Sequence, residues 1–304
     1  MSACCFGSIS PLTQVALENG AALQAIQAWR YCTTAILLLV YAALRPRVTR
    51  ASTDENHATP WYSPRVLLLA GGGQASVATL ALLSLRWLPT ATSAFLFYTY
   101  PAWVAIITAL RGIEPLDRTR VVALMLALGG IVIMVGAPDA ATLHPVGVVV
   151  ILGGALVYAL YIPLLNSLQR GRGPMDVARA ISVGGALLFL AWAIATGSLF
   201  THFDARTMVA SVAQGVLSAG AFLGFLAGLS TLGAVRTAIT STVEPFWTTV
   251  LAFLLLGQPI GGGTLLGGAA IMAAVLLLQR PVVALPRLHS SPAHEGDHPD
   301  HPNP

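Results

Sequence analysis

Two stretches decide the fold, YPAWVAIITALRGIEPL at residues 100–116 and EPFWTTVLAFLLLGQPI at residues 244–260, because the second repeats the pattern of the first. They align without a gap when the sequence is shifted by 144 residues. Chance matches are frequent in a chain rich in alanine, leucine and glycine, but three matches involve rarer residues: Pro101 with Pro245, Trp103 with Trp247, and Pro115 with Pro259. Because an internal repeat constrains the whole fold, we expect two related halves.

The composition indicates that both halves lie in a membrane. Of the 304 residues, 56% are hydrophobic and only 9% are charged, whereas soluble domains contain about 25% charged residues. The uncharged runs are long enough to supply the ~20 apolar residues that one helical crossing of a bilayer needs. Backbone in lipid must satisfy its own hydrogen bonds, so only helices or a closed barrel can cross. The runs lack the alternation of barrel strands, and we predict an all-α membrane protein.

Ten segments are predicted to be transmembrane helices. They are residues 3–19, 26–44, 66–84, 90–110, 120–137, 146–168, 180–198, 209–230, 236–256 and 263–279. Each copy of the repeat contains five of them, and because five is odd, the second copy enters the membrane from the opposite side. The prediction is therefore two inverted five-helix repeats, an arrangement common in secondary transporters. They occupy residues 1–137 and 138–280, and the polar residues 281–304 form a disordered cytoplasmic tail.

The arginines orient the predicted helices. All 16 basic residues are arginine, and only Arg30, Arg86 and Arg206 lie toward the outer side when the N-terminus is placed in the cytoplasm. By the positive-inside rule this arrangement puts both termini in the cytoplasm. We expect a multi-pass protein of the plasma (inner) membrane, in contact with membrane lipid. The net charge of +4 comes from arginines at membrane ends, so it does not call for a nucleic-acid partner.

Three motifs carry a resemblance to a known family. They are LPTATSAFLFYTYPAWVAIITALRGIEPLDRTRVVALMLALGGIVIM at 88–134, GAVRTAITSTVEPFWTTVLAFLLLGQPIGGGTLLGGAAIMAAVLLL at 233–278, and QAIQAWRYCTTAILLLVYAAL at 24–44. The sequence resembles the drug/metabolite transporter superfamily in its EamA-type ten-helix form, over residues 3 to 280. The resemblance implies a transporter working as an exporter, and its motifs identify the fold better than the substrate.

The sequence departs from the family pattern at two places. The first helix of the family usually contains Trp-Gly, where this chain has Phe6-Gly7 close to Met1. We therefore expect either that the chain starts late relative to the family or that its true start lies upstream. The acid of the short loop is Glu114 in the first repeat, but its counterpart is Gln258. A symmetric role for that acid is therefore not expected.

Glu244 is an acidic residue within the otherwise apolar segment 236–256, and its presence there needs an explanation. A charge at the bilayer centre costs about 2.5–3.5 kcal/mol on insertion scales. The carboxyl group is therefore protonated, paired with another group, or directed at a wet cavity. The functional hypothesis is that Glu244 lines a cavity, where it binds an amine or exchanges a proton. The alternative is a neutral acid that hydrogen-bonds to a neighbouring helix.

Other residues of the repeat are candidates for the cavity wall. We predict that Tyr100, Trp103, Trp247 and Gln74 line it together with Glu244; the alternative for the tryptophans is packing between the halves. Tyr98, Tyr158 and Tyr161 add further polar groups. Pro101 and Pro245 each remove a backbone donor and are expected to kink their helices. The kinks are predicted to serve as hinges, with fixed packing geometry as the alternative.

The remaining polar residues have less specific interpretations. Arg30 is expected to pair with Glu18, to extend toward the interface, or to contact a carboxylate of the substrate. The loop that contains Glu114 and Asp117 is expected to be solvated, with an ion-pair latch as the alternative. The histidine-rich tail is interpreted as a plain cytoplasmic extension.

The motifs of enzymes and of metal or cofactor sites are not evident. We find no phosphate-binding loop, no metalloprotease motif and no convincing set of nucleophile and base. Cys4, Cys5 and Cys32 have no spacing that suggests a metal site or a disulfide. The prediction is a protein that is not an enzyme, with no catalytic residues, no metal and no cofactor.

The most specific hypothesis from the sequence is a secondary transporter of small organic metabolites, such as amino acids or amine-bearing compounds. It would work by alternating access, driven by a proton gradient or by exchange. The alternatives are a passive channel or facilitator of the same fold, and a membrane scaffold that transports nothing. The identity of the solute, the coupling ion and the formation of a homodimer stay open.

Overall fold

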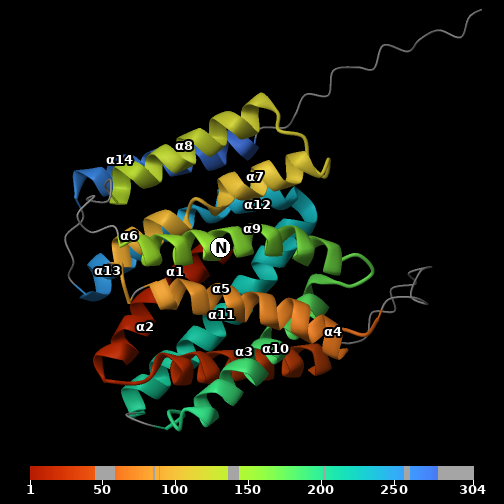
Figure 1. The fold of residues 1–304 in the computed structure, drawn as a ribbon, viewed down its shortest axis with the longest axis vertical. Helices are drawn as coiled ribbons and strands as arrows, with labels where there is room; N and C mark the ends of the chain where they lie inside the picture. Colours follow the sequence, from red (N-terminus) through yellow and green to blue (C-terminus); the bar gives the residue numbers. More distant parts are fainter. Residues whose placement is uncertain are drawn as a thin grey trace, which may run out of the picture.

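The fold is described from a computed structural model. It covers residues 1–44, 59–84, 86–88, 90–135, 144–200, 203–256 and 261–279. Within these ranges every regular element is helical, which confirms the predicted all-α class. Figure 1 shows the helices stacked from α8 and α14 at the top to α3 and α10 at the bottom. The predicted tail at 281–304 and the residues Gln258 and Pro259 lie outside the described part of the chain.

The helices follow the predicted segments. Their bounds are α1 (Ser2–Gly7), α2 (Ile9–Glu18), α3 (Leu23–Leu44), α4 (Pro64–Leu67), the π-helix η1 (Leu68–Gly72), α5 (Gly73–Ser84), α6 (Thr90–Phe97), α7 (Tyr100–Leu110), α8 (Arg118–Val135), α9 (Pro145–Leu168), α10 (Pro174–Ala195), α11 (Ala205–Leu232), α12 (Ala234–Ser241), α13 (Val243–Leu256) and α14 (Gly262–Gln279). Six of the predicted segments coincide with one helix each, and the other four are divided.

Four helical stretches of the described chain are long and apolar enough to cross a membrane. They are Thr92–Leu110, Pro145–Leu168, Pro174–Ala195 and Ala205–Leu232. A shorter apolar helix spans Leu265–Leu278. The count of ten crossings therefore stays a prediction.

Prolines explain three of the divisions. Pro11, Pro101 and Pro245 each lie in the first turn of the second helix of a divided pair, namely α2, α7 and α13. Proline lacks the backbone N–H and its ring collides with the carbonyl four residues earlier, so it is tolerated best in the first turn of a helix. The kinks predicted at Pro101 and Pro245 thus take the form of short breaks, at which Thr99 and Thr242 keep backbone angles of the helical region.

The fourth division is a π-helical turn that the sequence did not indicate. The hydroxyl of Tyr161 in α9 donates a hydrogen bond to the carbonyl oxygen of Ala70 within η1. A Cβ at Gly73 would lie 2.5 Å from the ring of Tyr161, so the glycine makes room for the tyrosine. Turns of this type are rare and often occur at functional sites.

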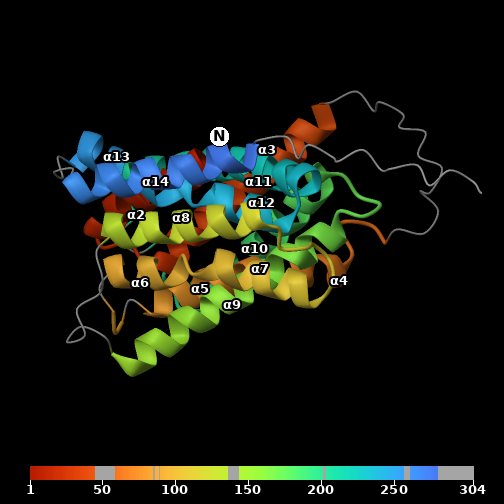
Figure 2. The same cartoon turned by 90° about the horizontal axis from the view of Figure 1, so that it is seen from above.

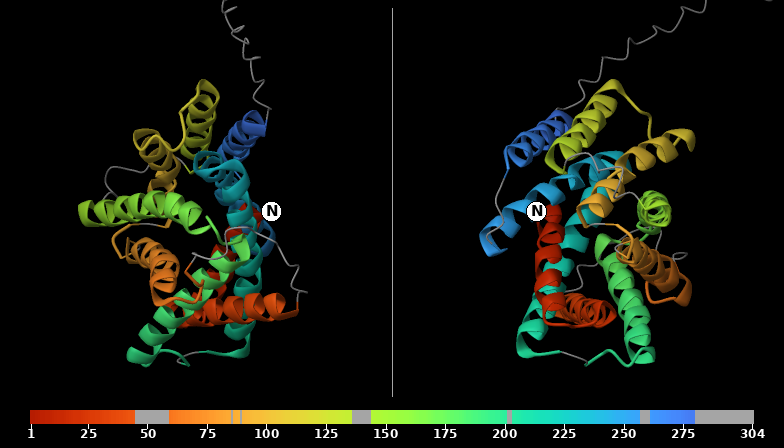
Figure 3. Two further views of the ribbon diagram at one scale, coloured as in Figure 1. Left: turned by 90° about the vertical axis from the view of Figure 1, so that its right-hand side faces the viewer. Right: turned by 60° about the vertical axis from the view of Figure 1, so that its left-hand side comes forward.

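The helix contacts follow a two-fold relation between the two repeats. Helix α3 packs on α10 and α8 packs on α14, so these corresponding helices of the two repeats pair with each other, and α7 of the first repeat packs on α12 of the second. Helix α5 packs on α9. The symmetry-related contact joins α11, the counterpart of α5, to α1 and α2, which together are the counterpart of α9. Figures 2 and 3 show α8 beside α14 in further views. The repeat found in the sequence is therefore present in the packing as well.

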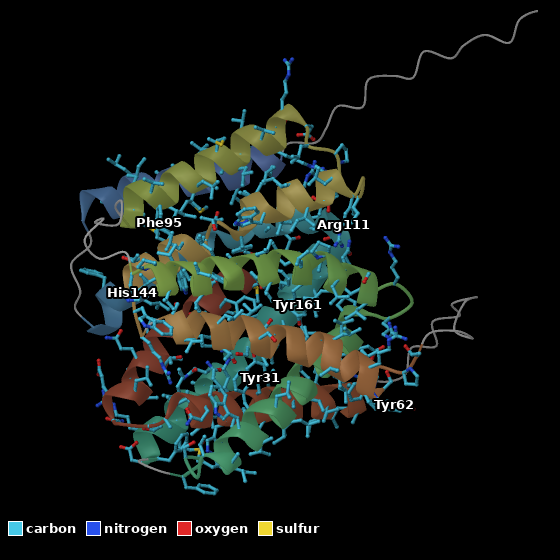
Figure 4. The ribbon with its side chains drawn as sticks, in the orientation of Figure 1. Tyr31, Tyr62, Phe95, Arg111, His144 and Tyr161 are labelled. Carbon is cyan, nitrogen blue, oxygen red and sulfur yellow. The ribbon has the colours of Figure 1, made fainter. Side chains whose placement is uncertain are left out.

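The corresponding helices run in opposite directions. Figure 1 shows α7 ending at the right-hand side of the molecule, whereas its counterpart α13 ends at the left-hand side. Figure 4 shows the same two ends through labelled side chains, with Arg111 and Tyr62 at one end and His144 at the other. This arrangement is the one that an inverted repeat requires.

Glycines allow the closest approaches between helices. A Cβ at Gly130 of α8 would lie 2.7 Å from the carbonyl oxygen of Gly267 in α14. A Cβ at Gly71 would lie 2.5 Å from backbone atoms of Gly184 in α10. Small residues have this role in membrane proteins, where backbones pack against each other directly.

Candidate functional site

Glu244 lies where the second repeat is interrupted. It is in the first turn of α13, two residues after Thr242, at which α12 ends. The hydroxyls of Ser241 and Thr242 donate hydrogen bonds to the carbonyls of Thr237 and Ile239, at 2.9 and 2.6 Å. These side chains thus bond to backbone carbonyls of α12 next to the interruption.

The partner of Glu244 comes from the matching interruption in the first repeat. Tyr98 lies between α6 and α7 and is the counterpart of Thr242 in the repeat. Its hydroxyl lies close to the carboxyl group of Glu244 and faces it. Glu244 takes part in no ion pair among the described residues, and its carboxyl group is enclosed by protein although the residue as a whole is only partly buried. The two interruptions therefore meet at an enclosed carboxyl group.

Aromatic rings surround this carboxyl group. The ring centroids of Tyr100 and Tyr158 are 4.7 Å apart in an edge-to-face arrangement, and Phe97 stacks on Tyr158 at 5.6 Å. Tyr98 and Tyr100 are 6.3 Å apart. The hydroxyl of Tyr100 also donates to the carbonyl oxygen of Ala238 in α12, at 3.3 Å. The cluster thus joins α6, α7, α9 and α12 around Glu244.

Two of the predicted wall residues lie in or next to this cluster. Tyr100 is buried and interacts electrostatically with Glu244. Gln74 of α5 lies beside the hydroxyl of Tyr31 in α3, and Tyr31 in turn interacts with Tyr158. Figure 4 shows Tyr31 and Tyr161 in the middle of the molecule, between the helix layers.

The two tryptophans lie away from the tyrosine cluster. Trp103 is 38% exposed on the outer face of α7, and the structure does not bring it to Glu244. Trp247 packs on α1, where its indole N–H donates to the hydroxyl of Ser8 at 3.0 Å. A Cβ at Gly7 would lie 3.2 Å from the Trp247 ring, so this tryptophan fits the packing alternative.

Tyr98 and Tyr158 belong to the cluster but were not among the predicted wall residues. The sequence marks them only as polar groups in apolar segments. In an unbroken helix Tyr98 and Tyr100 would point to different sides. The interruption before Pro101 lets both face Glu244, and this consequence cannot be read from helical periodicity.

Arg30 is a second charged group in the interior. It is only 7% exposed, and its Nε donates to the hydroxyl of Ser218 in α11 at 2.7 Å. Its Nη1 donates to Gln27 Oε1 at 3.2 Å. The expected pair with Glu18 is not formed, and Glu18 accepts instead from Gln14 at 3.4 Å. The reason is that α3 begins at Leu23, which places Arg30 two turns inside the helix.

The loop after α7 forms a contact between the repeats at the other end of α12. Glu114 accepts hydrogen bonds from the backbone N–H groups of Ala234 and Val235, at 2.5 and 3.4 Å. Arg120 lies 3.7 Å from the same carboxyl group. Gly233 has φ of +82°, and a Cβ there would lie 2.7 Å from Glu114. The alternative of an ion-pair latch is therefore closer to the structure than a fully solvated loop.

Metal ligands do not gather in the part of the chain that the structure describes. No group of three or more histidine, cysteine, aspartate or glutamate side chains is placed to hold a metal ion there. Cys4, Cys5 and Cys32 are free thiols. The chemistry that the described site offers is hydrogen bonding by Glu244 and its tyrosines, together with the charge of Arg30.

Comparisons with known proteins agree with the repeat. The profile of the EamA-like transporter family matches residues 1–136 and, a second time, residues 145–280. A solved structure, titled only as the crystal structure of a protein, has a TM-score of 0.73 and 19% sequence identity; the match covers 91% of this chain and 94% of that one. At that identity the likeness concerns the fold alone. No curated protein matches the chain. Because the two family matches together span nearly all of the helical sequence, the chain belongs to the EamA-like transporter family, within the drug/metabolite transporter superfamily.

Proposed function

We propose that this membrane transporter is a secondary carrier that exports small organic metabolites, such as amino acids or amine-bearing compounds. Ten helices would cross the plasma (inner) membrane, with both termini in the cytoplasm. The solute would bind near mid-membrane, between the repeats, and be exposed to one side at a time. The export direction rests on the likeness to the family.

The observation that carries the proposal is the carboxyl group of Glu244, which is enclosed at the junction of two interrupted helices and forms no ion pair among the described residues. Its Tyr98 partner comes from the other repeat, so any movement of one repeat relative to the other changes the surroundings of the acid. A carboxyl group of this kind can bind an ammonium group or release a proton. Both are established uses of ionisable residues inside membranes.

The hinges and the latch support an alternating mechanism. The interruptions before Pro101 and Pro245 are sites where backbone angles can change without loss of regular helix bonds. The Glu114 contact with the start of α12 joins the repeats on the predicted cytoplasmic side. Breaking that contact would open the bundle toward the cytoplasm, while the outer side closes.

Counterflow in proteoliposomes tests the proposal. Vesicles containing the purified full chain are loaded with one unlabelled amino acid, diluted, and given the same labelled amino acid, across a panel and with or without a pH gradient. A carrier produces transient accumulation of label, and the gradient changes the rate if protons are coupled. A channel equilibrates label without accumulation, and a scaffold gives no flux above empty vesicles; either result contradicts the proposal.

A further inference from the structure

The predicted cytoplasmic ends of α4 and α10 bring together four arginines from separate parts of the chain. Arg65 lies in α4, Arg170 and Arg172 lie in the turn between α9 and α10, and Arg179 lies in the second turn of α10. Helix α4 packs on α10, and Figure 4 marks this end of the molecule with the labelled Tyr62. These four arginines form the basic cluster.

Contacts with the segment before α4 hold two members of the cluster in place. Arg172 donates through Nε and Nη2 to the carbonyl oxygen of Thr59, at 2.9 and 2.6 Å, and through Nη1 to the carbonyl oxygen of Leu168, at 3.1 Å. The guanidinium carbon of Arg179 lies 4.6 Å from the centre of the Trp61 ring. Carbonyl groups and an aromatic ring are neutral, so these contacts position the two guanidinium groups without cancelling their charge.

The basic cluster carries more positive charge than its neighbouring acid can balance. Within the described ranges, Arg179 forms an ion pair with Asp176, and no other ion pair involves the cluster. Arg65 and Arg170 are exposed, and their side chains form no ion pair with another described residue. Four arginines and one aspartate give this described group a net charge of +3. The surplus favours an anionic partner from outside the chain.

Aromatic and apolar surface continues from the cluster along the same segment. Tyr62 is 63% exposed, and its ring lies edge-to-face on that of Trp61 at 5.7 Å. Leu68 and Leu69 follow Arg65 by three and four residues, so they lie on the same side of the helix, and both are exposed. Tyrosine and tryptophan favour the level of the lipid headgroups. Charge, aromatic rings and apolar side chains thus follow one another as headgroup, interface and hydrocarbon do in a lipid.

We propose that the basic cluster binds the phosphate group of an anionic phospholipid, such as phosphatidylglycerol, with an acyl chain lying over Leu68 and Leu69. Guanidinium groups bind phosphate through paired N–H groups, and basic groups at the cytoplasmic side of membrane proteins bind anionic headgroups. Arg65 and Arg170 would contact the phosphate, while Arg172 adds charge. A soluble phosphate compound would match the charge but leave the leucines uncovered, so a lipid is the occupant that uses both parts. The inference does not depend on which solute is transported.

Lipid binding to the purified full chain tests the proposal. Native mass spectrometry measures the affinity for phosphatidylglycerol and for phosphatidylcholine, and thermal unfolding in detergent measures the stabilisation by each lipid. Phosphatidylglycerol should bind more tightly than phosphatidylcholine and raise the melting temperature more. Arg65→Gln and Arg170→Gln should each weaken phosphatidylglycerol binding about fivefold, the contribution of one arginine near an anionic surface. Both residues are exposed, so the melting temperature of each lipid-free variant should equal that of the wild type.

The matched control is Arg118→Gln. Arg118 is an exposed arginine at the start of α8, and Figure 1 shows α8 at the opposite edge of the molecule from α10. This variant should bind phosphatidylglycerol as the wild type does, and glycerol phosphate, which lacks acyl chains, should not stabilise the wild type. Equal weakening by all three substitutions would mean a diffuse attraction between charges and would overturn the proposal. Equal affinity for the two lipids, or stabilisation by glycerol phosphate as large as that by the lipid, would overturn it as well.

Discussion

At the scale of the residue, the account depends on Glu244. The sequence alone shows an acid in an apolar segment, and the structure adds that the tyrosine hydroxyl facing it, that of Tyr98, belongs to the other repeat. Glu244 thus lies at the point where the interrupted helices of both repeats meet, which favours the transport role.

Replacing Glu244 by glutamine should lower the initial transport rate by about tenfold or more, because hydrogen bonds to charged groups contribute about 1.5–3 kcal/mol. Tyr98→Phe, which keeps the ring but removes the donor, should lower it less. Rates are measured in proteoliposomes, and the amount of monodisperse protein is measured by size-exclusion chromatography. Normal transport by Glu244→Gln would exclude the acid from the mechanism.

At the scale of the element, helix packing and helix ends have separate determinants. Neighbouring glycines of α8 differ in their surroundings: Gly130 faces α14, whereas a Cβ at Gly129 would meet nothing within 4 Å. At helix starts, carboxylates of Glu114 and Asp204 accept backbone N–H groups of α12 and α11. Each of these features predicts a defined change in stability.

Gly130→Ala should destabilise the protein by about 1–3 kcal/mol, because the added methyl group meets a backbone oxygen that cannot move away easily. Gly129→Ala is the matched control and should be neutral or stabilising by up to about 1 kcal/mol, since alanine favours helix. Thermal unfolding of both variants in the same detergent checks the pair. Equal melting temperatures would mean that α8 and α14 do not pack as described.

Glu114→Ala should expose the start of α12. Loss of a helix cap costs about 0.5–2 kcal/mol, which corresponds to a roughly two- to thirtyfold increase in local opening. Hydrogen exchange of peptides covering residues 233–241 measures it. Arg111→Ala, an exposed change in the same loop, is the control, and equal exchange in both variants would contradict the capping role.

The stability of the folded protein is predicted to depend on pH through Asp204. Hydrogen bonds from Thr207 hold the pKa of the Asp204 carboxyl below its usual value. A group whose pKa is lowered by folding stabilises the protein above its unfolded pKa of about 3.9 and loses that contribution as the pH falls through its folded value.

The melting temperature of Asp204→Ala should therefore lie below that of the wild type at neutral pH, and the two should converge in acid. Asp204→Asn keeps an oxygen acceptor at the cap but does not titrate, so its melting temperature relative to Asp204→Ala should stay constant with pH. A wild-type advantage over Asp204→Ala that persists in acid would refute the assignment.

At the scale of the whole molecule, the repeat in the sequence predicted most of the fold. Every predicted helical segment has its counterpart among the helices, because apolar length and arginine placement depend on the membrane rather than on particular contacts. The interruptions were predicted only as kinks, and η1 was not predicted. That turn depends on Tyr161 reaching the Ala70 carbonyl, a contact between helices far apart in the sequence.

The sequence predicted those members of the candidate site that stand out individually, without knowledge of their contacts. Glu244, Tyr100 and Gln74 stand out as polar groups in apolar segments, and the structure places Tyr100 beside Glu244 and Gln74 next to Tyr31. Trp103 could not be assigned from periodicity, because the outer and inner faces of an apolar helix have similar sequences. The neutral partners of Arg30 depend on how α3 crosses α11, which the sequence does not specify.

The opposite threading of the two repeats is tested most directly by labelling cysteines. Ile113, which is 43% exposed in the loop after α7, and Gly261, which is exposed before α14, are replaced singly by cysteine in a variant without Cys4, Cys5 and Cys32. In intact cells an impermeant maleimide should label position 261, and position 113 only after permeabilisation. Labelling of both positions from the same side of the membrane would contradict the inverted repeat, and with it the proposed transport cycle.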